Sequence, residues 1–289
     1  MKLALGSVQF GLDYGIANQG GQVSQDEVKL ILNHACAHGM NTIDTAINYG
    51  NSEQRLGEIG MPSGWQVISK LPALQEYCQN VEAWVHSEVL ASLDRLRIPR
   101  LRGLLLHRPE QLFGSHGKKI HQALLELKQQ GLVEKVGVSI YDPAELDLLT
   151  QCFPLDIVQA PFNILDRRLI TSGWMDRLPK MNIELHTRSV FLQGLLLMPG
   201  MKRPDKFNRW QPLWQKWEQW LSEIGLTPLQ VCLRDALAQT GIARVVVGVD
   251  SLFQIKEILL AAEGSTPELP EALCCNDIDL INPARWNNL

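Results

Sequence analysis

The stretch Asn41-Thr-Ile-Asp-Thr-Ala-Ile-Asn-Tyr-Gly50 ends a short apolar run on a carboxylate and places an aromatic hydroxyl five residues later. Because aspartate is disfavoured inside strands, Asp44 is predicted to lie where a strand ends. Tyr49 would then lie on the following loop and reach over the same strand end. Asp44 and Tyr49 therefore form a candidate proton-handling pair, provided that a cation joins them.

Seven further short apolar runs repeat this pattern, and stretches with helical features separate them. The predicted strands cover residues 2–5, 42–44, 65–69, 101–106, 135–138, 155–158, 183–186 and 244–247. Strands that alternate with helices indicate parallel βαβ units, and eight units in 289 residues predict an α/β (β/α)8 TIM barrel. No G-x-G-x-x-G follows any run, which disfavours a doubly wound dinucleotide-binding fold.

The helices between these strands are predicted from apolar spacing and capping residues. Ser24 and Glu27 have the spacing of a capping box, so a helix begins after Ser24. Further helices are expected at 52–59, 81–96, 120–130, 142–150, 169–178, 228–239 and 254–263. We expect one domain over residues 1–289, with an irregular C-terminal tail from about residue 265.

Tryptophan is concentrated in one segment after the seventh predicted strand. Trp210, Trp214 and Trp217 fall on one helical face, and Trp220 follows them. This face either packs against the barrel or forms a wall of the substrate pocket, and the spacing leaves both interpretations open.

Composition and charge exclude several classes of protein. The net charge of −4 and the lack of a basic run argue against binding to nucleic acid. No stretch reaches the ~18 apolar residues of a membrane span, and the apolar start of the chain is too short for a signal peptide. The six cysteines form no CxxC pair, which is typical of reduced thiols in a cytoplasmic protein.

The residues at the predicted strand ends are mostly polar or ionisable. In a (β/α)8 barrel the carboxyl ends of the strands meet at one face, where active sites lie. Taken singly, Lys70 has a simpler explanation as a solvated loop lysine, and His107 as a turn residue. Their convergence on one face favours a site. The strand ends are Ser7, Asp44, Lys70, His107, Ser139, Gln159, Arg188 and Gly248.

Four of these residues make a chemical unit. A free tyrosine, with a pKa of about 10, is a poor acid at neutral pH, and a nearby ammonium such as Lys70 favours the phenolate. Asp44 would keep Lys70 charged, and His107 would donate a hydrogen bond to an oxygen that gains charge. This unit contains no Ser–His nucleophile pair and no set of three metal ligands at plausible spacing, so a nicotinamide cofactor is the expected electron source.

On these residues the chain resembles the aldo-keto reductase family from Leu5 to about Ala261. The family's Asp–Tyr–Lys–His tetrad matches Asp44, Tyr49, Lys70 and His107. The resemblance implies a barrel that binds NAD(P)H without a Rossmann fold. It also implies reduction of an aldehyde or ketone, with Tyr49 as the general acid.

The resemblance also implies a set of cofactor-binding residues. Arg188 stands where the family often has a stacking tyrosine, and Ile140 replaces an asparagine. NADPH is the family's usual cofactor, with NADH as the alternative, because Asp250 would repel the 2′-phosphate of NADPH and Lys256 is the one nearby cation. The implied contacts are Gly6, Ser7, Ser139, Gln159, Arg188, Ser189, Phe191, Gln193, Gly248, Gln254 and Glu257.

Two other functions share this fold. A cofactor-binding regulatory subunit would keep the barrel without turnover, and a barrel lyase or epimerase would use the tyrosine and lysine without nicotinamide. The tetrad disfavours the first and the Ser139 and Gln159 matches disfavour the second. The expected partner is a small carbonyl substrate, and the sequence predicts no oligomeric state.

Overall fold

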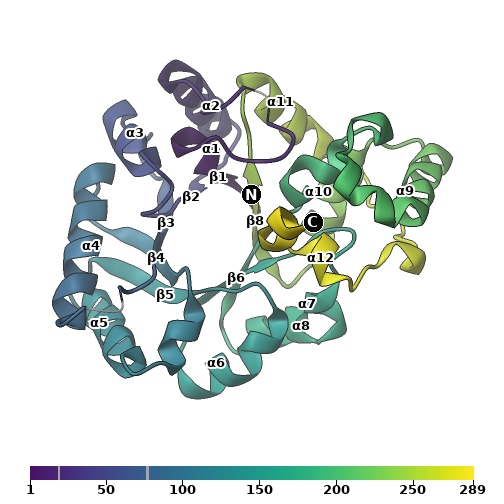
Figure 1. Ribbon diagram of the computed structural model, residues 1–289. Helices are drawn as coiled ribbons and strands as arrows, with labels where there is room; N and C mark the ends of the chain where they lie inside the picture. Colours follow the sequence, from purple (N-terminus) through teal and green to yellow (C-terminus); the bar gives the residue numbers. More distant parts are fainter. Residues whose placement is uncertain (19, 76–77) are drawn as a thin grey trace.

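Eight short runs of aliphatic residues form the strands of a closed parallel barrel in the computed structural model, which describes residues 1–18, 20–75 and 78–289 (Figure 1). Each strand pairs with the next in chain order, and the eighth returns to the first through the register Leu5 to Val247. The strands are β1 (Leu3–Gly6), β2 (Thr42–Asp44), β3 (Gln66–Leu71), β4 (Leu101–Leu106), β5 (Val133–Ser139), β6 (Ile157–Pro161), β7 (Glu184–Arg188) and β8 (Ile242–Gly248).

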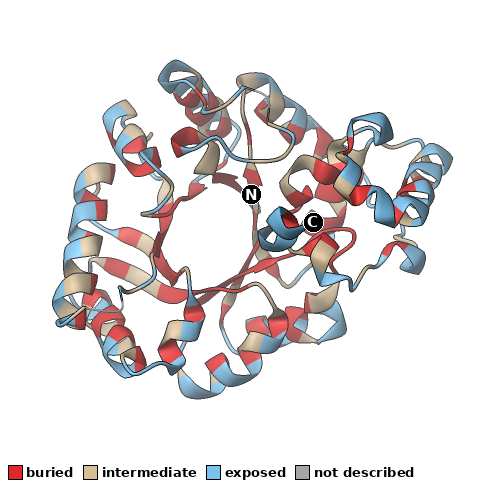
Figure 2. Ribbon diagram, viewed as in Figure 1, coloured by how far each residue is buried: buried red, intermediate tan, exposed pale blue. Residues whose placement is uncertain are grey.

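Helices surround the barrel and bury one face each against it (Figure 2). The α-helices are α1 (Val8–Gly11), α2 (Gln25–Ala37), α3 (Ser52–Ile59), α4 (Val81–Leu96), α5 (Gly117–Gln129), α6 (Leu146–Cys152), α7 (Arg168–Thr171), α8 (Trp174–Lys180), α9 (Gln211–Ile224), α10 (Pro228–Ala238), α11 (Leu252–Ala261) and α12 (Ile278–Ile281). The 3-10 turns are η1 (Pro109–Phe113), η2 (Pro143–Glu145), η3 (Leu192–Leu197), η4 (Gly200–Lys202), η5 (Asp205–Trp210), η6 (Glu271–Leu273) and η7 (Pro283–Asn288). In the described residues no helix is both long and apolar enough to cross a bilayer.

The predicted barrel is confirmed, and several element bounds agree with the prediction to the residue. β2, β4, α3 and α4 have the bounds expected from the sequence. The single helix predicted over 169–178 is wrong: it is divided into α7 and α8, because Gly173 adopts a left-handed conformation (φ 75°) between them.

The capping box predicted at the start of α2 forms only in part. The Ser24 side chain accepts a hydrogen bond from the Glu27 N–H, as expected. The Glu27 carboxylate does not return to the Ser24 backbone; it accepts the N–H of Leu252, 2.6 Å away, at the start of α11. Glu27 therefore ties α2 to α11 across the seam where the chain closes the barrel.

The tail from about residue 265, expected to be irregular, contains η6, α12 and η7. Trp286 is buried, and its ring meets that of Phe207 edge-on with centroids 4.9 Å apart. Trp214 and Trp217 of α9 are also buried. Packing of a tail and a helix against the barrel explains most of the tryptophan in this region.

Inside the barrel, an apolar layer lies below the polar strand ends. Ile68, Leu105 and Ile157 form a small buried cluster separate from the main core. Since side chains two residues apart share one face of a strand, the same inward face carries Lys70, His107 and Gln159 one step nearer the carboxyl ends. The aliphatic layer thus fills the barrel beneath the polar groups and keeps water from entering below.

Candidate active site

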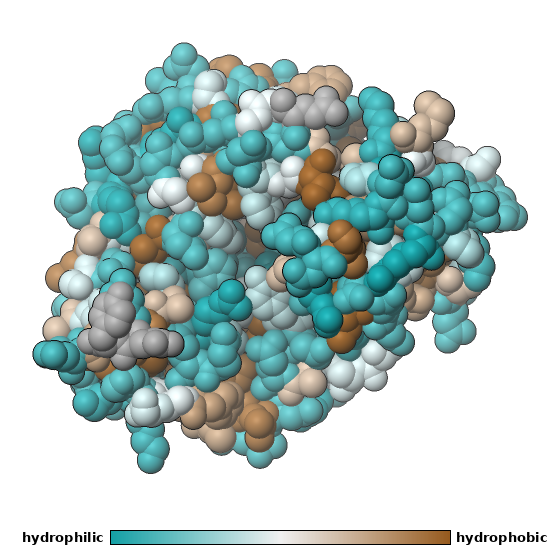
Figure 3. All heavy atoms as spheres, in the orientation of Figure 1, coloured by the Kyte–Doolittle hydropathy of each residue, from teal (hydrophilic) through white to brown (hydrophobic). Residues whose placement is uncertain are grey.

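A cavity of about 590 Å³ opens at the carboxyl ends of the strands. The space-filling view shows a hollow near the middle of this face, with hydrophilic side chains around much of its rim (Figure 3). The wall contains groups from the strand ends, the loop after β1 and the loop after β7. This size is ordinary for a site that binds a small molecule or a cofactor.

Asp44 and Lys70 form a buried ion pair at the floor of the cavity. The Lys70 Nζ lies 2.6 Å from Asp44 Oδ1, and the two side chains are 1% and 7% exposed. Lys70 also donates to the carbonyl oxygen of Thr45 at 2.9 Å. Burial lowers the pKa of Lys70, but Asp44 and Tyr49 raise it by more, so its pKa lies above the ordinary value. Lys70 is therefore a fixed positive charge.

Gln159 extends this pair across the barrel. Its Nε2 donates to Asp44 Oδ2 at 2.6 Å, and its Oε1 accepts from the Ser139 hydroxyl at 3.3 Å. The Asp44 carboxylate is thus held on both oxygens, once by Lys70 and once by Gln159. Charge-assisted hydrogen bonds of this kind fix the position of a carboxylate well.

Tyr49 stands on the turn that follows β2, above the ion pair. Lys70 Nζ lies 4.9 Å from the centre of the Tyr49 ring, and the His107 ring meets the same ring edge-on at 5.9 Å. The turn depends on Gly50, which has a φ of 56° and would place a Cβ 2.3 Å from the carbonyl oxygen of Gly11. Only a glycine at position 50 therefore allows the turn that positions Tyr49.

His107 is uncharged near neutral pH. Burial, followed by the positive charges of Lys70 and Arg188, lowers the pKa of His107 to about 4. Its Nδ1 lies 3.2 Å from Asn48 Oδ1, so the ring nitrogen donates to that oxygen. Rotation of the Asn48 carboxamide would reverse these roles and place the proton on Nε2 instead.

Arg188 projects from the end of β7 into the cavity wall. It donates to the carbonyl oxygen of Ile140 at 3.0 Å and to the hydroxyl of Ser189 at 3.3 Å. Its guanidinium lies 4.6 Å from the centre of the Tyr141 ring. These three contacts hold the arginine in one orientation, since a planar guanidinium fits such a combination of ring and acceptors.

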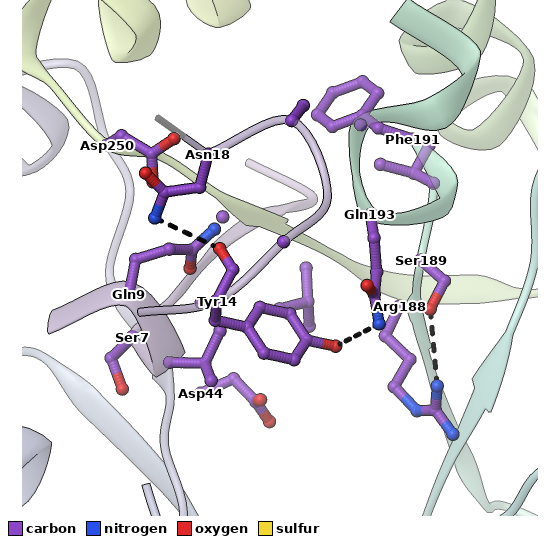
Figure 4. Close-up of a pocket in the computed structure, with 18 of the residues that line it drawn as sticks. Ser7, Gln9, Tyr14, Asn18, Asp44, Arg188, Ser189, Phe191, Gln193 and Asp250 are labelled. Carbon is purple, nitrogen blue, oxygen red and sulfur yellow. Dashed lines mark hydrogen bonds between the residues drawn. The ribbon is translucent and has the colours of Figure 1, made fainter. Parts of the chain in front are cut away.

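The loops after β1 and β7 meet over the cavity (Figure 4). The Gln193 side chain donates to the Tyr14 hydroxyl at 3.0 Å, and a Cβ at Gly194 would lie 2.5 Å from that of Ala17. Ser189 and Gln193 both have left-handed backbones, with φ of 63° and 52°. Strained backbone of this kind concentrates at ligand-binding loops.

The opposite end of the cavity contains two buried oxygen acceptors. Gln9 Oε1 and Asp250 Oδ1 are buried without a hydrogen-bond partner among the described residues. Gln254 lies beside them and accepts the N–H of Asp250 at 2.7 Å. Burial raises the pKa of Asp250 above its ordinary value, and Asp13 adds to the rise. This end therefore presents acceptors that a ligand with hydroxyl groups would satisfy.

The structure brings the residues predicted from the sequence to one place. Every one of them lines the cavity except Lys70, which lies beneath it. Sequence reasoning missed several polar side chains that line the cavity, among them Gln9, Tyr14, Asn18, Asn48 and Tyr141. A signal existed for Tyr14 and Asn18, because they lie in a glycine-rich loop after a strand end, but nothing in the spacing indicated their partners.

The chain is similar to one known family over nearly its whole length. The profile of the Aldo/keto reductase family matches residues 2–268. A curated relative, the NADH-specific methylglyoxal reductase of Escherichia coli (strain K12), is 25% identical over 269 residues, which cover 79% of each chain. An uncharacterized oxidoreductase of Bacillus subtilis (strain 168), YqkF, is 23% identical over 260 residues, covering 80% of this chain and 81% of its own.

A solved structure gives the same fold. The holo form of the aldo-keto reductase AKR11C1 from Bacillus halodurans aligns with a TM-score of 0.74, at 19% identity. The alignment covers 96% of this chain and 94% of that one. The match therefore extends over nearly the whole barrel.

Proposed function

The chain belongs to the aldo/keto reductase family and is an NAD(P)H-dependent oxidoreductase, and from this premise we propose that it reduces the carbonyl group of an aldehyde or ketone with Tyr49 as the general acid. The single observation that carries the proposal is the buried ammonium of Lys70. Asp44 holds it 4.9 Å from the centre of the Tyr49 ring. A positive charge so placed stabilises the phenolate that remains when Tyr49 gives its proton to the carbonyl oxygen.

The residues around Tyr49 have separate tasks in this proposal. Gln159 and Lys70 hold both oxygens of Asp44, so the ion pair keeps one geometry during proton transfer. His107 is neutral and adjacent to the Tyr49 ring. With the Asn48 carboxamide rotated so that its NH₂ donates to Nδ1, the proton of His107 lies on Nε2 and can be donated to the substrate oxygen without a second positive charge. The aliphatic layer of Ile68, Leu105 and Ile157 excludes water from beneath the pair.

The cavity fits a nicotinamide dinucleotide on the evidence of its unpaired acceptors. Gln9 Oε1 and Asp250 Oδ1 would accept hydrogen bonds from ribose hydroxyls. Gly248 lets the Gln9 amide lie against the backbone, because a Cβ at residue 248 would lie 2.5 Å from Gln9 Nε2. Ser139 and Gln159 lie at the other end, where they would meet the carboxamide. When bound, the reduced cofactor supplies the hydride.

We propose NADH rather than NADPH as the preferred cofactor, in place of the family's usual choice. Arg188 is the only permanently charged cation among the described residues lining the cavity, and it lies at the Ser139 end. Lys256 does not line the cavity. Asp250 would accept from a ribose hydroxyl and repel a phosphate, as acidic residues do in dinucleotide-binding folds. The name of the Escherichia coli relative supports the same preference.

The test is calorimetric titration of the protein with NADH and with NADPH, followed by turnover of an aldehyde panel that includes methylglyoxal. We expect NADH to bind at least about tenfold more tightly, because placing a phosphate against a buried carboxylate costs more than about 1.4 kcal/mol. Asp250→Ser should narrow that difference. Failure to bind either cofactor would overturn the proposal, and binding without turnover of any aldehyde would favour a cofactor-binding regulatory subunit.

We place the protein in a reducing compartment and propose the cytoplasm. All six cysteines are free thiols. Cys232 is buried, and burial raises the pKa of its thiol. Unreactive thiols of this kind are common where disulfides do not form.

A further inference from the structure

Arg188 is a fixed positive charge in the cavity wall that has no acidic partner in the described part of the chain. Its guanidinium has five N–H donors. One donates to the Ile140 carbonyl and one to the Ser189 hydroxyl. Among residues 1–18, 20–75 and 78–289, no ion pair joins it to a carboxylate, whereas Arg167, Arg168 and Arg203 each have at least one. The remaining donors of Arg188 are available to a ligand in the cavity.

The surroundings of Arg188 do not neutralise it. Asp44 is the carboxylate at the floor of the site, and its charge is matched by Lys70 at 2.6 Å. His107 carries no charge near neutral pH. The acidic residues Asp250 and Glu257 also line the cavity, but Asp250 follows β8 and Glu257 lies on α11, at its other end. The part of the cavity between Arg188 and Tyr49 is therefore net positive.

The orientation of Arg188 is set before any ligand arrives. Arg188 is the last residue of β7. Its guanidinium contacts the Tyr141 ring and the Ile140 carbonyl, and both of these residues lie in the segment that follows β5. A charged side chain held from two strands loses little conformational entropy when it binds an anion. Such a guanidinium suits the two oxygens of a carboxylate or phosphate.

We propose that Arg188 is a specificity-determining residue that binds an anionic group of the substrate, so that the preferred substrates are aldehydes or ketones carrying a carboxylate or a phosphate. This inference rests on the proposed carbonyl reduction and names the substrate class of the same site. Contact with the cofactor is the competing use of Arg188, either with its phosphates or with the nicotinamide ring on which the family's tyrosine often stacks. The bond from the Arg188 guanidinium to the backbone at Ile140, next to Ser139, disfavours the phosphates. The NADH affinity of an Arg188→Gln variant tests the contact with the ring.

The test compares matched pairs of substrates that differ only in the anionic group. Succinic semialdehyde is compared with butanal, and glyceraldehyde 3-phosphate with glyceraldehyde, each with saturating NADH. We expect the wild type to favour at least one anionic member by about 10- to 100-fold in kcat/KM, the usual strength of a hydrogen bond to a charged group. The pair that shows the preference identifies carboxylate or phosphate as the ligand.

Two variants and one control assign the preference to Arg188. Arg188→Gln should abolish it, mainly through KM for the anionic member, and Arg188→Lys should restore only part of it because the planar fork is lost. Arg100→Gln is the control. It removes an exposed positive charge at the amino end of β4, where Arg100 pairs with Glu134 at 3.0 Å, and should leave the preference unchanged.

A binding measurement keeps the inference independent of turnover. Succinate and inorganic phosphate are titrated calorimetrically into the NADH-loaded protein. One of them should bind the wild type and bind Arg188→Gln at least about tenfold more weakly. The inference would be overturned if neither anion bound the wild type, or if Arg188→Gln kept the preference for anionic substrates. It would also be overturned if Arg188→Gln lost NADH affinity and activity on neutral substrates to the same extent as activity on anionic ones. Absence of all turnover with intact anion binding would refute the proposed reduction and support the anion subsite.

Discussion

Replacement of Asp44 by Asn tests the buried ion pair more severely than any other single change. The side chains have nearly the same shape, so packing is preserved while the negative charge is removed. Lys70, 1% exposed, would keep its charge with only the Thr45 carbonyl as an acceptor. One carboxylate oxygen also becomes an N–H₂ group that faces a donor on either Lys70 or Gln159.

The expected loss of folding stability follows from the burial of this pair. Removing one partner of a buried pair costs about 3–5 kcal/mol, because the other charge is left uncompensated. For a chain of this size the loss lowers the melting temperature by on the order of 10 °C. A variant that also replaces Lys70 by Met should recover much of the stability, since no unpaired charge is then buried.

The stability difference between wild type and Asp44→Asn should shrink as pH rises. In the wild type the pKa of Lys70 is raised above its ordinary value, so the stabilisation is full below that ordinary value and is lost as pH rises through the folded-state pKa. In Asp44→Asn the burial effect dominates and lowers the pKa of Lys70. The unfolded chain then holds more protons than the folded one, and the variant gains stability with pH up to about 10.

Urea unfolding, followed by circular dichroism at about pH 7 and about pH 9.5, measures this dependence. Wild type, the single variant and the double variant are compared under the same conditions. The assignment of a charged and mutually dependent pair would be refuted if Asp44→Asn lowered the free energy of unfolding by less than about 1 kcal/mol at pH 7. It would also be refuted if the difference in free energy between wild type and variant grew with pH.

Three further predictions concern residues around the site and the barrel. Asn48→Asp should raise the pKa of His107 from about 4 toward its ordinary value, because a carboxylate stabilises the imidazolium; an NMR titration that still gave about 4 would contradict the Asn48 contact. Since the low pKa of His107 costs the folded state stability as pH falls from about 6.5 toward 4, the variant should also resist acid better than the wild type. Gly137→Ala should prevent the barrel from folding stably, because the added Cβ would lie 1.8 Å from the backbone oxygen of Ile157. A variant with the melting temperature of wild type would show that the strands separate more easily than the structure indicates. Glu53→Ala should cost about 2–3 kcal/mol in urea unfolding, since two buried serines and an arginine donate to that carboxylate, and an unchanged midpoint would exclude this role.

The barrel was predictable because local signals agreed with the global pattern. β2 and β4 each end where an apolar run meets an ionisable group, so Asp44 and His107 marked their ends in the sequence. Two-residue alternation then predicts that Lys70 and Gln159 face inward from neighbouring parts of the barrel. Closure of the barrel converts that alternation into the contacts of Asp44 with both residues.

Other features depend on contacts that no local pattern encodes. Tyr14 and Gln193 meet although 179 positions separate them, and Glu27 binds the backbone of Leu252 instead of its own helix start. The tail has too little periodicity to predict helices, and burial of Trp286 accounts for its order. Side-chain pairs of this kind are set by tertiary packing, which a single sequence does not display.

The end of the cavity around Gln9 and Asp250 bears on the proposed choice between NADH and NADPH. The family's usual cofactor favoured NADPH, whereas Gln254 and Asp250 in the sequence weighed against it and Lys256 was the one nearby cation. The structure adds that Asp250 and Gln9 are buried acceptors without partners and that Lys256 does not line the cavity. Charge and hydrogen bonding at this end therefore both support NADH.

The most direct test of the proposed reduction is single-turnover oxidation of bound NADH by an aldehyde in Tyr49→Phe. The variant keeps the ring that lies 4.9 Å from Lys70 and edge-on to His107, and removes only the hydroxyl. We expect NADH to bind within about threefold of wild type and the rate to fall by about 10²- to 10⁴-fold, the usual contribution of a general acid. A rate within about twofold of wild type, with NADH bound, would contradict Tyr49 as the acid.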